Sequence, residues 1–173
     1  MRLLSTTGPA LATVLLASPG SQAGQCTRID TTVATTFFVA GCTSPVGICT
    51  TGTVPSGLLK GTTRFTALTI TPGPSPDLLL YTGELVITTR SGTVTIRNSG
   101  MLDGATGSYF EFEQVVGGMR LFRHARGALT SQGIATGTGF FGTLAGVLCS
   151  GKHDDRHDSR GHQASREEQG ADD

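Results

Sequence analysis

Three polar side chains lie among apolar neighbours in segments where polar and apolar residues alternate. They are Tyr81, Asn98 and Gln114. A phenol and two amides on an apolar face can orient a small, mostly apolar ligand through a few hydrogen bonds. In the alternative interpretation these side chains lie near the rim of the fold and bond to backbone groups or water. We predict them as ligand-binding residues and assign no catalytic residue.

Charged side chains of the same segments are expected on the opposite, solvent-facing side. Glu111 and Glu113 lie two residues apart, a spacing that puts both carboxylates on one face of a strand, where they could transfer protons. Because we expect this face to meet water, their pKa values would hardly separate, and a solvated edge is the favoured interpretation. Glu84 and Arg97 are expected to form a cross-strand pair on the same surface.

Basic residues gather in a second cluster. His124 lies among Arg120, Arg123 and Arg126, a group that could bind an anion. For His124 a surface position beside a turn is the favoured interpretation, and for the whole cluster a solubilising edge that discourages strand-to-strand aggregation.

Motifs for cofactors and metals are weak. Residues 137–142 spell G-x-G-x-x-G, but a strand ending in a cysteine follows instead of the helix that a dinucleotide site needs. His153, His157 and His162, with nearby aspartates, could chelate a metal, although a solvated tail is favoured. We predict no cofactor and no metal site.

The strongest structural pattern covers residues 78–102. Leu79, Tyr81, Leu85 and Ile87 fall on one strand face with Gly83 between them, while threonine and charged residues occupy the other. A second strand follows the turn at residues 91–92, where Gly92 can adopt the positive φ that a tight hairpin turn needs. The segment predicts a β-hairpin with one buried face.

Further strands are expected on both sides of this hairpin. In residues 108–116 we expect Phe110, Phe112, Gln114 and Val116 to face inward, with a turn at residues 117–118. Residues 119–130 have a composition that allows a helix, but the flanking glycines favour a strand kinked near residues 125–127. The remaining extended segments are residues 26–39, 57–71 and 131–149, with a short piece around Ile48. The total of about seven or eight strands predicts an all-β fold, a single closed antiparallel barrel.

Cysteines and the two termini suggest an exported protein. Residues 1–23 resemble a signal peptide because a short apolar run follows Arg2 and small residues precede residue 24. The four cysteines allow three disulfide pairings, of which we prefer Cys42–Cys49 with Cys26–Cys149. Zinc is disfavoured because no C-x2-C pair is present.

Composition sets the domain boundaries and excludes some partners. Residues 24–150 form the predicted barrel domain, and residues 151–173 are predicted to be a disordered, charged tail because they hold no apolar residue larger than alanine. The formal net charge is zero, without the basic stripe of a nucleic-acid binder. No segment is long and apolar enough to cross a bilayer, so no integral membrane association is expected.

Several segments resemble the bacterial exported proteins of the allene oxide cyclase-like barrel family, distantly similar to plant dirigent proteins. The resemblance lies in LLYTG at residues 79–83 with LVITTRSGTVTIRNSG at 85–100, VVGGMRLFRHARGAL at 115–129 and GTGFFGTLAGVLC at 137–149. LLKGTTRF at residues 58–65 fits as well. Phe122, Ala125 and Gly127 match the glycine-rich pattern of this family, whereas His124 stands where a glycine is expected. The resemblance implies an eight-stranded, calycin-like barrel with an apolar interior, and a trimer.

Two functions follow as expectations. The first is a secreted barrel that binds a small apolar ligand or serves as a stable extracellular scaffold. The second is an isomerase or cyclase that holds a reactive substrate in one conformation inside a dry barrel. Convergence of Tyr81, Asn98 or Gln114 on a cavity would favour binding or catalysis, and a barrel filled by phenylalanines would favour a scaffold.

Overall fold

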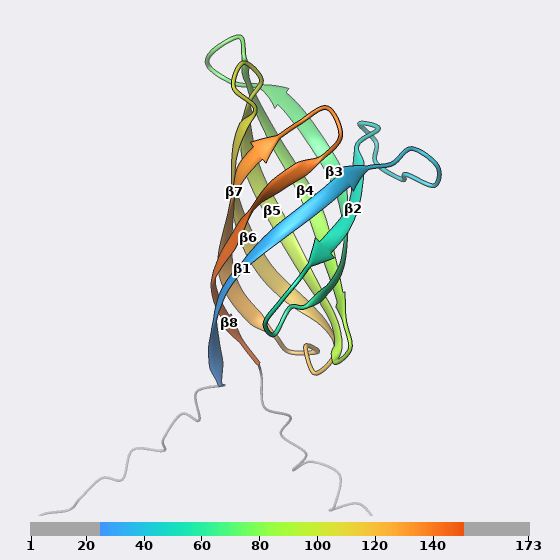
Figure 1. The fold of residues 1–173 in the computed structure, drawn as a ribbon, viewed down its shortest axis with the longest axis vertical. Coiled ribbons are helices and arrows are strands. Elements are labelled where there is room, and N and C mark those ends of the chain that lie inside the picture. Colours follow the sequence, from blue (N-terminus) through green and yellow to red (C-terminus); the bar gives the residue numbers. More distant parts are fainter. Residues whose placement is uncertain (1–24, 151–173) are drawn as a thin grey trace, which may run out of the picture.

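A computed structural model describes residues 25–150, which form one closed antiparallel barrel of eight strands, each paired with its neighbours in the chain (Figure 1). The predicted signal peptide and charged tail lie outside the described residues. The strands are β1 (Cys26–Phe37), β2 (Cys49–Val54), β3 (Gly61–Pro72), β4 (Leu78–Thr89), β5 (Gly92–Asp103), β6 (Ser108–Arg120), β7 (Arg126–Ala135) and β8 (Phe140–Cys149). The predicted all-β barrel is confirmed.

The hairpin of β4 and β5 has the predicted register and buried face. Leu85 lies opposite Ile96 and Ile87 opposite Val94, and all four side chains are buried. Because side chains alternate across a strand, this pairing directs every second residue of both strands into the barrel. Pro72 ends β3, so the proline-rich segment that follows is a connection between strands.

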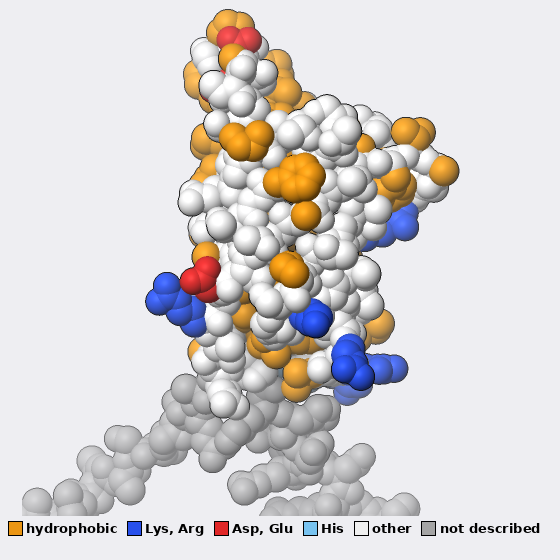
Figure 2. Space-filling view, in the orientation of Figure 1, with side chains coloured by type: hydrophobic (Ala, Val, Ile, Leu, Met, Phe, Trp, Pro, Cys, Tyr) orange, Lys and Arg blue, Asp and Glu red, His pale blue; other side chains and the backbone are white. Residues whose placement is uncertain are grey.

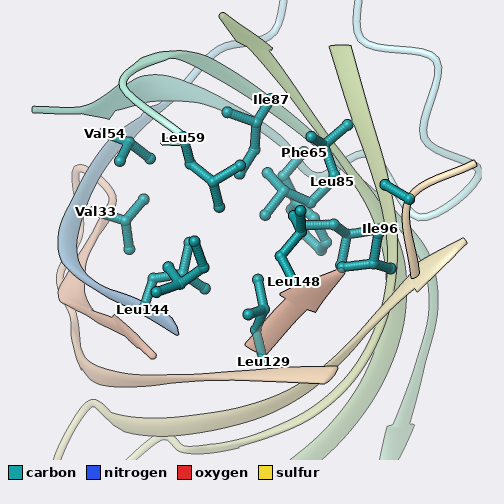
Figure 3. Packing of buried hydrophobic residues seen from close by; sticks show 14 of the residues in the cluster. Val33, Val54, Leu59, Phe65, Leu85, Ile87, Ile96, Leu129, Leu144 and Leu148 are labelled. Carbon is teal, nitrogen blue, oxygen red and sulfur yellow. The ribbon is translucent and has the colours of Figure 1, made fainter. Parts of the chain in front are cut away.

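Apolar side chains from all eight strands and two loops meet inside the barrel (Figure 3). At the end where β1 begins, Leu59 and Phe122 reach in from the β2–β3 and β6–β7 loops and are almost completely buried. An eight-stranded barrel is just wide enough for side chains to fill it or for one small ligand. Loop residues therefore close this end, which we call the base.

Strand β6 departs from the prediction in two ways. The predicted inward face is wrong: Phe110 and Phe112 are 40% and 54% exposed, whereas Tyr109 and Val115 are buried. The predicted turn at residues 117–118 is also wrong, because β6 continues to Arg120 through a bulge that leaves Val116 as an extra residue. Gly117 has a φ of 144° there, a conformation that side chains rarely adopt.

The chain reverses at residues 121–125, within the segment predicted as a kinked strand. Backbone hydrogen bonds from Phe122 to Met119 and from Ala125 to Phe122 form this turn. The reversal separates β6 from β7, so residues 119–130 are neither one strand nor a helix.

Both predicted disulfides are confirmed. The terminal disulfide, Cys26–Cys149, joins residues 123 positions apart that face each other where β1 pairs with β8. The loop disulfide, Cys42–Cys49, spans 7 positions and holds the β1–β2 loop against the start of β2. The terminal disulfide thus locks the seam at which the sheet closes.

Charged side chains are sparse on the outer surface. Figure 2 shows broad uncharged areas, with most Lys and Arg side chains of this face toward the base. Glu84 and Arg97 lie opposite each other across β4 and β5, and both are exposed. Among residues 25–150, no helix is long and apolar enough to span a membrane.

Candidate functional site

A cavity of about 40 Å³ lies inside the barrel, in the half farther from the terminal disulfide. We call it the chamber. Its polar wall comes mainly from β5, β6 and β7, and its apolar wall from the other strands. The chamber is lined by Val33, Thr35, Thr50, Phe65, Leu85, Ile87, Asn98, Tyr109, Glu111, Glu113, Ser131, Phe140 and Leu144.

Tyr81 reaches the chamber wall across a glycine. Cross-strand pairing places Tyr81, Gly100 and Glu111 side by side on β4, β5 and β6. A Cβ atom on Gly100 would lie 2.6 Å from Cζ of Tyr81, so only glycine leaves room for this ring. The Tyr81 hydroxyl can therefore donate a hydrogen bond of 2.9 Å to Oε1 of Glu111.

Asn98 donates to the same carboxylate oxygen. Its Nδ2 lies 3.1 Å from Oε1 of Glu111, while its backbone pairs with that of Glu113. Oε1 of Glu111 accepts the hydrogen bond from Tyr81, so any further partner of this oxygen must also be a donor. The amide of Asn98 must therefore turn its nitrogen, and not its oxygen, toward Glu111. The remaining amide oxygen, Oδ1 of Asn98, is buried and has no partner within the described residues, and the same holds for Oε2 of Glu113.

The two carboxyl groups interact, and both have raised pKa values. Burial raises the pKa of Glu113 well above its usual range, and the charge of Glu111 and a hydrogen bond to it act in the same direction. Burial also raises the pKa of Glu111, opposed by hydrogen bonds from Tyr81, Glu113 and Ser131. Within the pair, Glu113 therefore holds a proton more readily than Glu111 does.

The two tyrosines beside this pair stay neutral. Burial and then the charge of Glu111 raise the pKa of Tyr81. Burial raises the pKa of Tyr109 more than its contact with Ser131 lowers it, where the two hydroxyl oxygens are 3.3 Å apart. Both tyrosines are therefore hydrogen-bond donors at neutral pH.

Aromatic rings lie where the chamber approaches the end of the barrel opposite the base. The Phe140 ring contacts the Tyr109 ring edge-on, at 5.2 Å between centroids, and the Phe37 ring at 5.5 Å. Phe37 is 40% exposed, and Phe140 is only partly buried. Phe140 therefore connects the lining of the chamber to the exposed Phe37 ring.

Charge is distributed unevenly between inside and outside. Every Lys, Arg and His side chain of residues 25–150 is exposed, whereas Glu113 is 1% exposed and lies inside the barrel. No basic side chain of the described residues therefore lines the chamber beside its two carboxyl groups.

The structure brings together two of the three predicted site residues. Tyr81 and Asn98 are 8% and 4% exposed and converge on Glu111. The prediction that Gln114 faces inward is wrong, because Gln114 lies on the outer face of β6. The predicted solvated edge is wrong for Glu111 and Glu113, since the reversed face of β6 turns both carboxyl groups into the barrel.

The weaker candidates stay outside the chamber. His124 is exposed in the β6–β7 turn, and residues 137–139 of the glycine motif form the loop before β8, with no helix after it. Within the described chain, no group of three or more His, Cys, Asp or Glu side chains could hold a metal ion. The tail histidines lie outside the described residues.

No family model, curated protein or solved structure matches this chain. The resemblance to the allene oxide cyclase-like family therefore stays a prediction, and the chamber itself is the basis for assigning a function.

Proposed function

We propose that this chain is a secreted binding protein whose chamber holds the polar head group of a small, otherwise apolar molecule. The observation that carries the proposal is two buried atoms with no hydrogen-bond partner within residues 25–150, Oδ1 of Asn98 and Oε2 of Glu113, whose side chains line one cavity. Burying a polar atom without a hydrogen bond costs about 1–3 kcal/mol, so such atoms usually have a water or ligand partner. The apolar wall opposite them suits the rest of the molecule.

The size of the chamber limits how a ligand binds. At about 40 Å³ it exceeds the volume that one water needs, but it is much smaller than the roughly 300 Å³ of a typical ligand pocket. The head group fits the chamber as it stands. The apolar body enters when Phe140 rotates away from Tyr109, or it remains between Phe140 and Phe37.

Secretion is part of the proposal. Two disulfides are compatible with an extracellular protein. The signal-peptide pattern of residues 1–23 and the resemblance to exported barrels support the same location.

An isomerase or cyclase is the second candidate, and the carboxyl pair is the observation that favours it. Burial raises the pKa of Glu113 well above its usual range and also raises that of Glu111, so one cavity holds two carboxyl groups suited to a general acid and a general base. A substrate whose reacting atoms enter the chamber could exchange protons with both groups. Binding is placed first because it needs only the geometry already present.

Native mass spectrometry of the secreted protein tests the proposal. We expect a retained small molecule, or stabilisation by members of a small-molecule library, that is lost in Asn98→Ala. Gln114→Ala is the matched control, because it removes an amide from the outer face of β6 and should change nothing. An empty protein that no compound stabilises, or equal effects of both variants, would contradict the proposal. The same spectra measure whether the protein is the trimer that the resemblance implies.

A further inference from the structure

We infer that the head group bound in the chamber is a protonated primary amine, held by Glu111, Glu113 and Asn98. This inference rests on the proposed binding function and adds to it the chemical class of the ligand.

The first argument is charge. Two carboxyl groups, those of Glu111 and Glu113, line the chamber, and every basic side chain of the described residues lies on the surface. A buried charge is costly unless it is paired. A monovalent cation beside the pair lets one of these carboxyl groups ionise with its charge paired, whereas a carboxylate or phosphate would add a like charge.

The second argument is hydrogen-bonding capacity. The Tyr81 hydroxyl and Nδ2 of Asn98 both donate to Oε1 of Glu111. The two buried atoms of the chamber that have no partner among the described residues, Oδ1 of Asn98 and Oε2 of Glu113, are oxygen acceptors. An alkylammonium group has three N–H donors and no acceptor. It therefore supplies the hydrogen-bond donors that these two acceptors lack, whereas a hydroxyl group supplies only one donor.

The third argument is how close these acceptors are. Asn98 and Glu113 are directly paired across β5 and β6, and their side chains point to the same side of the sheet. Such neighbours have Cβ atoms about 5 Å apart, so one small head group can reach both. Both side chains are more than nine-tenths buried, which fixes the position of the acceptors before any ligand arrives.

The opposite wall distinguishes an organic cation from a metal ion. Phe65, Phe140 and Leu144 line the chamber together with the polar groups, and they offer aromatic and apolar surface. Aromatic rings attract ammonium groups, and apolar side chains accommodate an alkyl chain. A calcium ion needs six to eight oxygen ligands, and the described residues hold no group of three or more His, Cys, Asp or Glu side chains that could bind a metal ion.

A comparison of isosteres on the full secreted protein tests the inference. Dissociation constants for n-butylamine and n-butanol are measured at pH 7 by NMR titration, at an ionic strength held constant with sodium chloride. We expect the amine to bind at least tenfold more tightly than the alcohol. Calcium chloride at millimolar concentration should neither shift the chamber resonances nor displace the amine.

Variants then locate the effect. Glu111→Gln keeps the shape of the side chain but removes its charge, and we expect it to abolish the tenfold preference for the amine. Glu84→Gln removes an exposed carboxyl group from β4 and should leave the preference unchanged. Circular dichroism confirms that each variant is folded. If Glu111→Gln does not fold, the preference of the wild type for the amine and the effect of Glu113→Gln on that preference still test the assignment.

The outcomes separate the two proposals. Preference for the alcohol, equal affinities, calcium competing with the amine, or an equal effect of Glu84→Gln would each overturn the amine assignment. If the alcohol binds in the chamber and the amine does not, the binding function stands without the amine. If neither probe binds, nor any member of the library, both proposals fail.

Discussion

The carboxyl pair predicts that the barrel loses stability as the pH rises above about 4.3, the pKa of a carboxyl group in the unfolded chain. A carboxyl group in the unfolded chain has a pKa of about 4.3, whereas burial raises the pKa of Glu113 well above that value in the fold. The folded protein therefore binds a proton that the unfolded chain has released. The stabilising effect of this bound proton is complete below the pKa that Glu113 has in the unfolded chain, and it is lost as the pH rises through the pKa that Glu113 has in the fold.

The expected size follows from proton linkage. Where the folded state binds one more proton than the unfolded state, the free energy of unfolding decreases by about 1.4 kcal/mol for each pH unit. The decrease begins near the unfolded pKa and stops at the raised folded pKa of Glu113. Glu111, whose pKa is also raised by burial, acts in the same direction.

Urea unfolding of the disulfide-intact protein at steps between pH 4.5 and 8 measures this slope. In Glu113→Gln the side chain is always neutral, so we expect a smaller slope and, above pH 7, a more stable protein than the wild type. Glu84→Gln changes an exposed carboxyl group and should reproduce the wild-type slope. A wild-type stability that stays constant or increases from pH 5 to 7 would refute a buried carboxyl pair with raised pKa values.

Three further predictions concern the barrel itself. Replacing both cysteines of the terminal disulfide with serine should lower the free energy of unfolding by about 5 kcal/mol in the chain-entropy account, because the disulfide closes a segment of 123 positions. The same replacement at the loop disulfide, which closes 7 positions, should lower it by about 2.5 kcal/mol. Equal losses of stability in chemical denaturation would contradict this account. Gly83→Ala should cost about 1–3 kcal/mol, because its Cβ would lie 2.2 Å from the Phe65 ring; an unchanged melting temperature would show that the ring moves freely. Phe122→Ala should cost about 3–5 kcal/mol by emptying the base, whereas Leu121→Ala, at a 52% exposed position, should have little effect on urea unfolding.

Sequence patterns predicted the barrel well where one strand face is clearly more apolar than the other. In β4 and β5 the inward positions hold Leu85, Ile87, Val94 and Ile96, and the alternating threonines leave no other assignment. The pairing of Cys26 with Cys149 was predictable as well, because a closed sheet brings its first and last strands together.

Strand β6 could not be oriented from its own composition. Phe110 and Phe112 make one face the more hydrophobic, yet this face is exposed, and the face with Glu111 and Glu113 points inward. Periodicity locates the apolar side of a strand but does not detect a buried carboxyl pair whose pKa values are raised by burial. The signal was in the register, because a short turn after β5 places Glu113 opposite the inward-facing Asn98.

The turn at residues 121–125 was missed for a similar reason. Gly117 and Gly118 looked like a turn, but they lie within β6, where Gly118 lets the β5 backbone approach so closely that a Cβ atom would clash with the carbonyl of Thr93. Glycine marks both turns and close strand contacts, and composition does not separate the two.

The position of the terminal disulfide also determines how the molecule can be attached to something else. The chain enters and leaves the barrel side by side at the base (Figure 1), while Phe37 and Phe140 lie toward the other end. The two ends of the described chain are joined by a hydrogen bond from the Ser150 amide to the Gln25 carbonyl, 3.0 Å long. An attachment made at either of these positions would therefore lie at the base, at the far end of the barrel from Phe37 and Phe140.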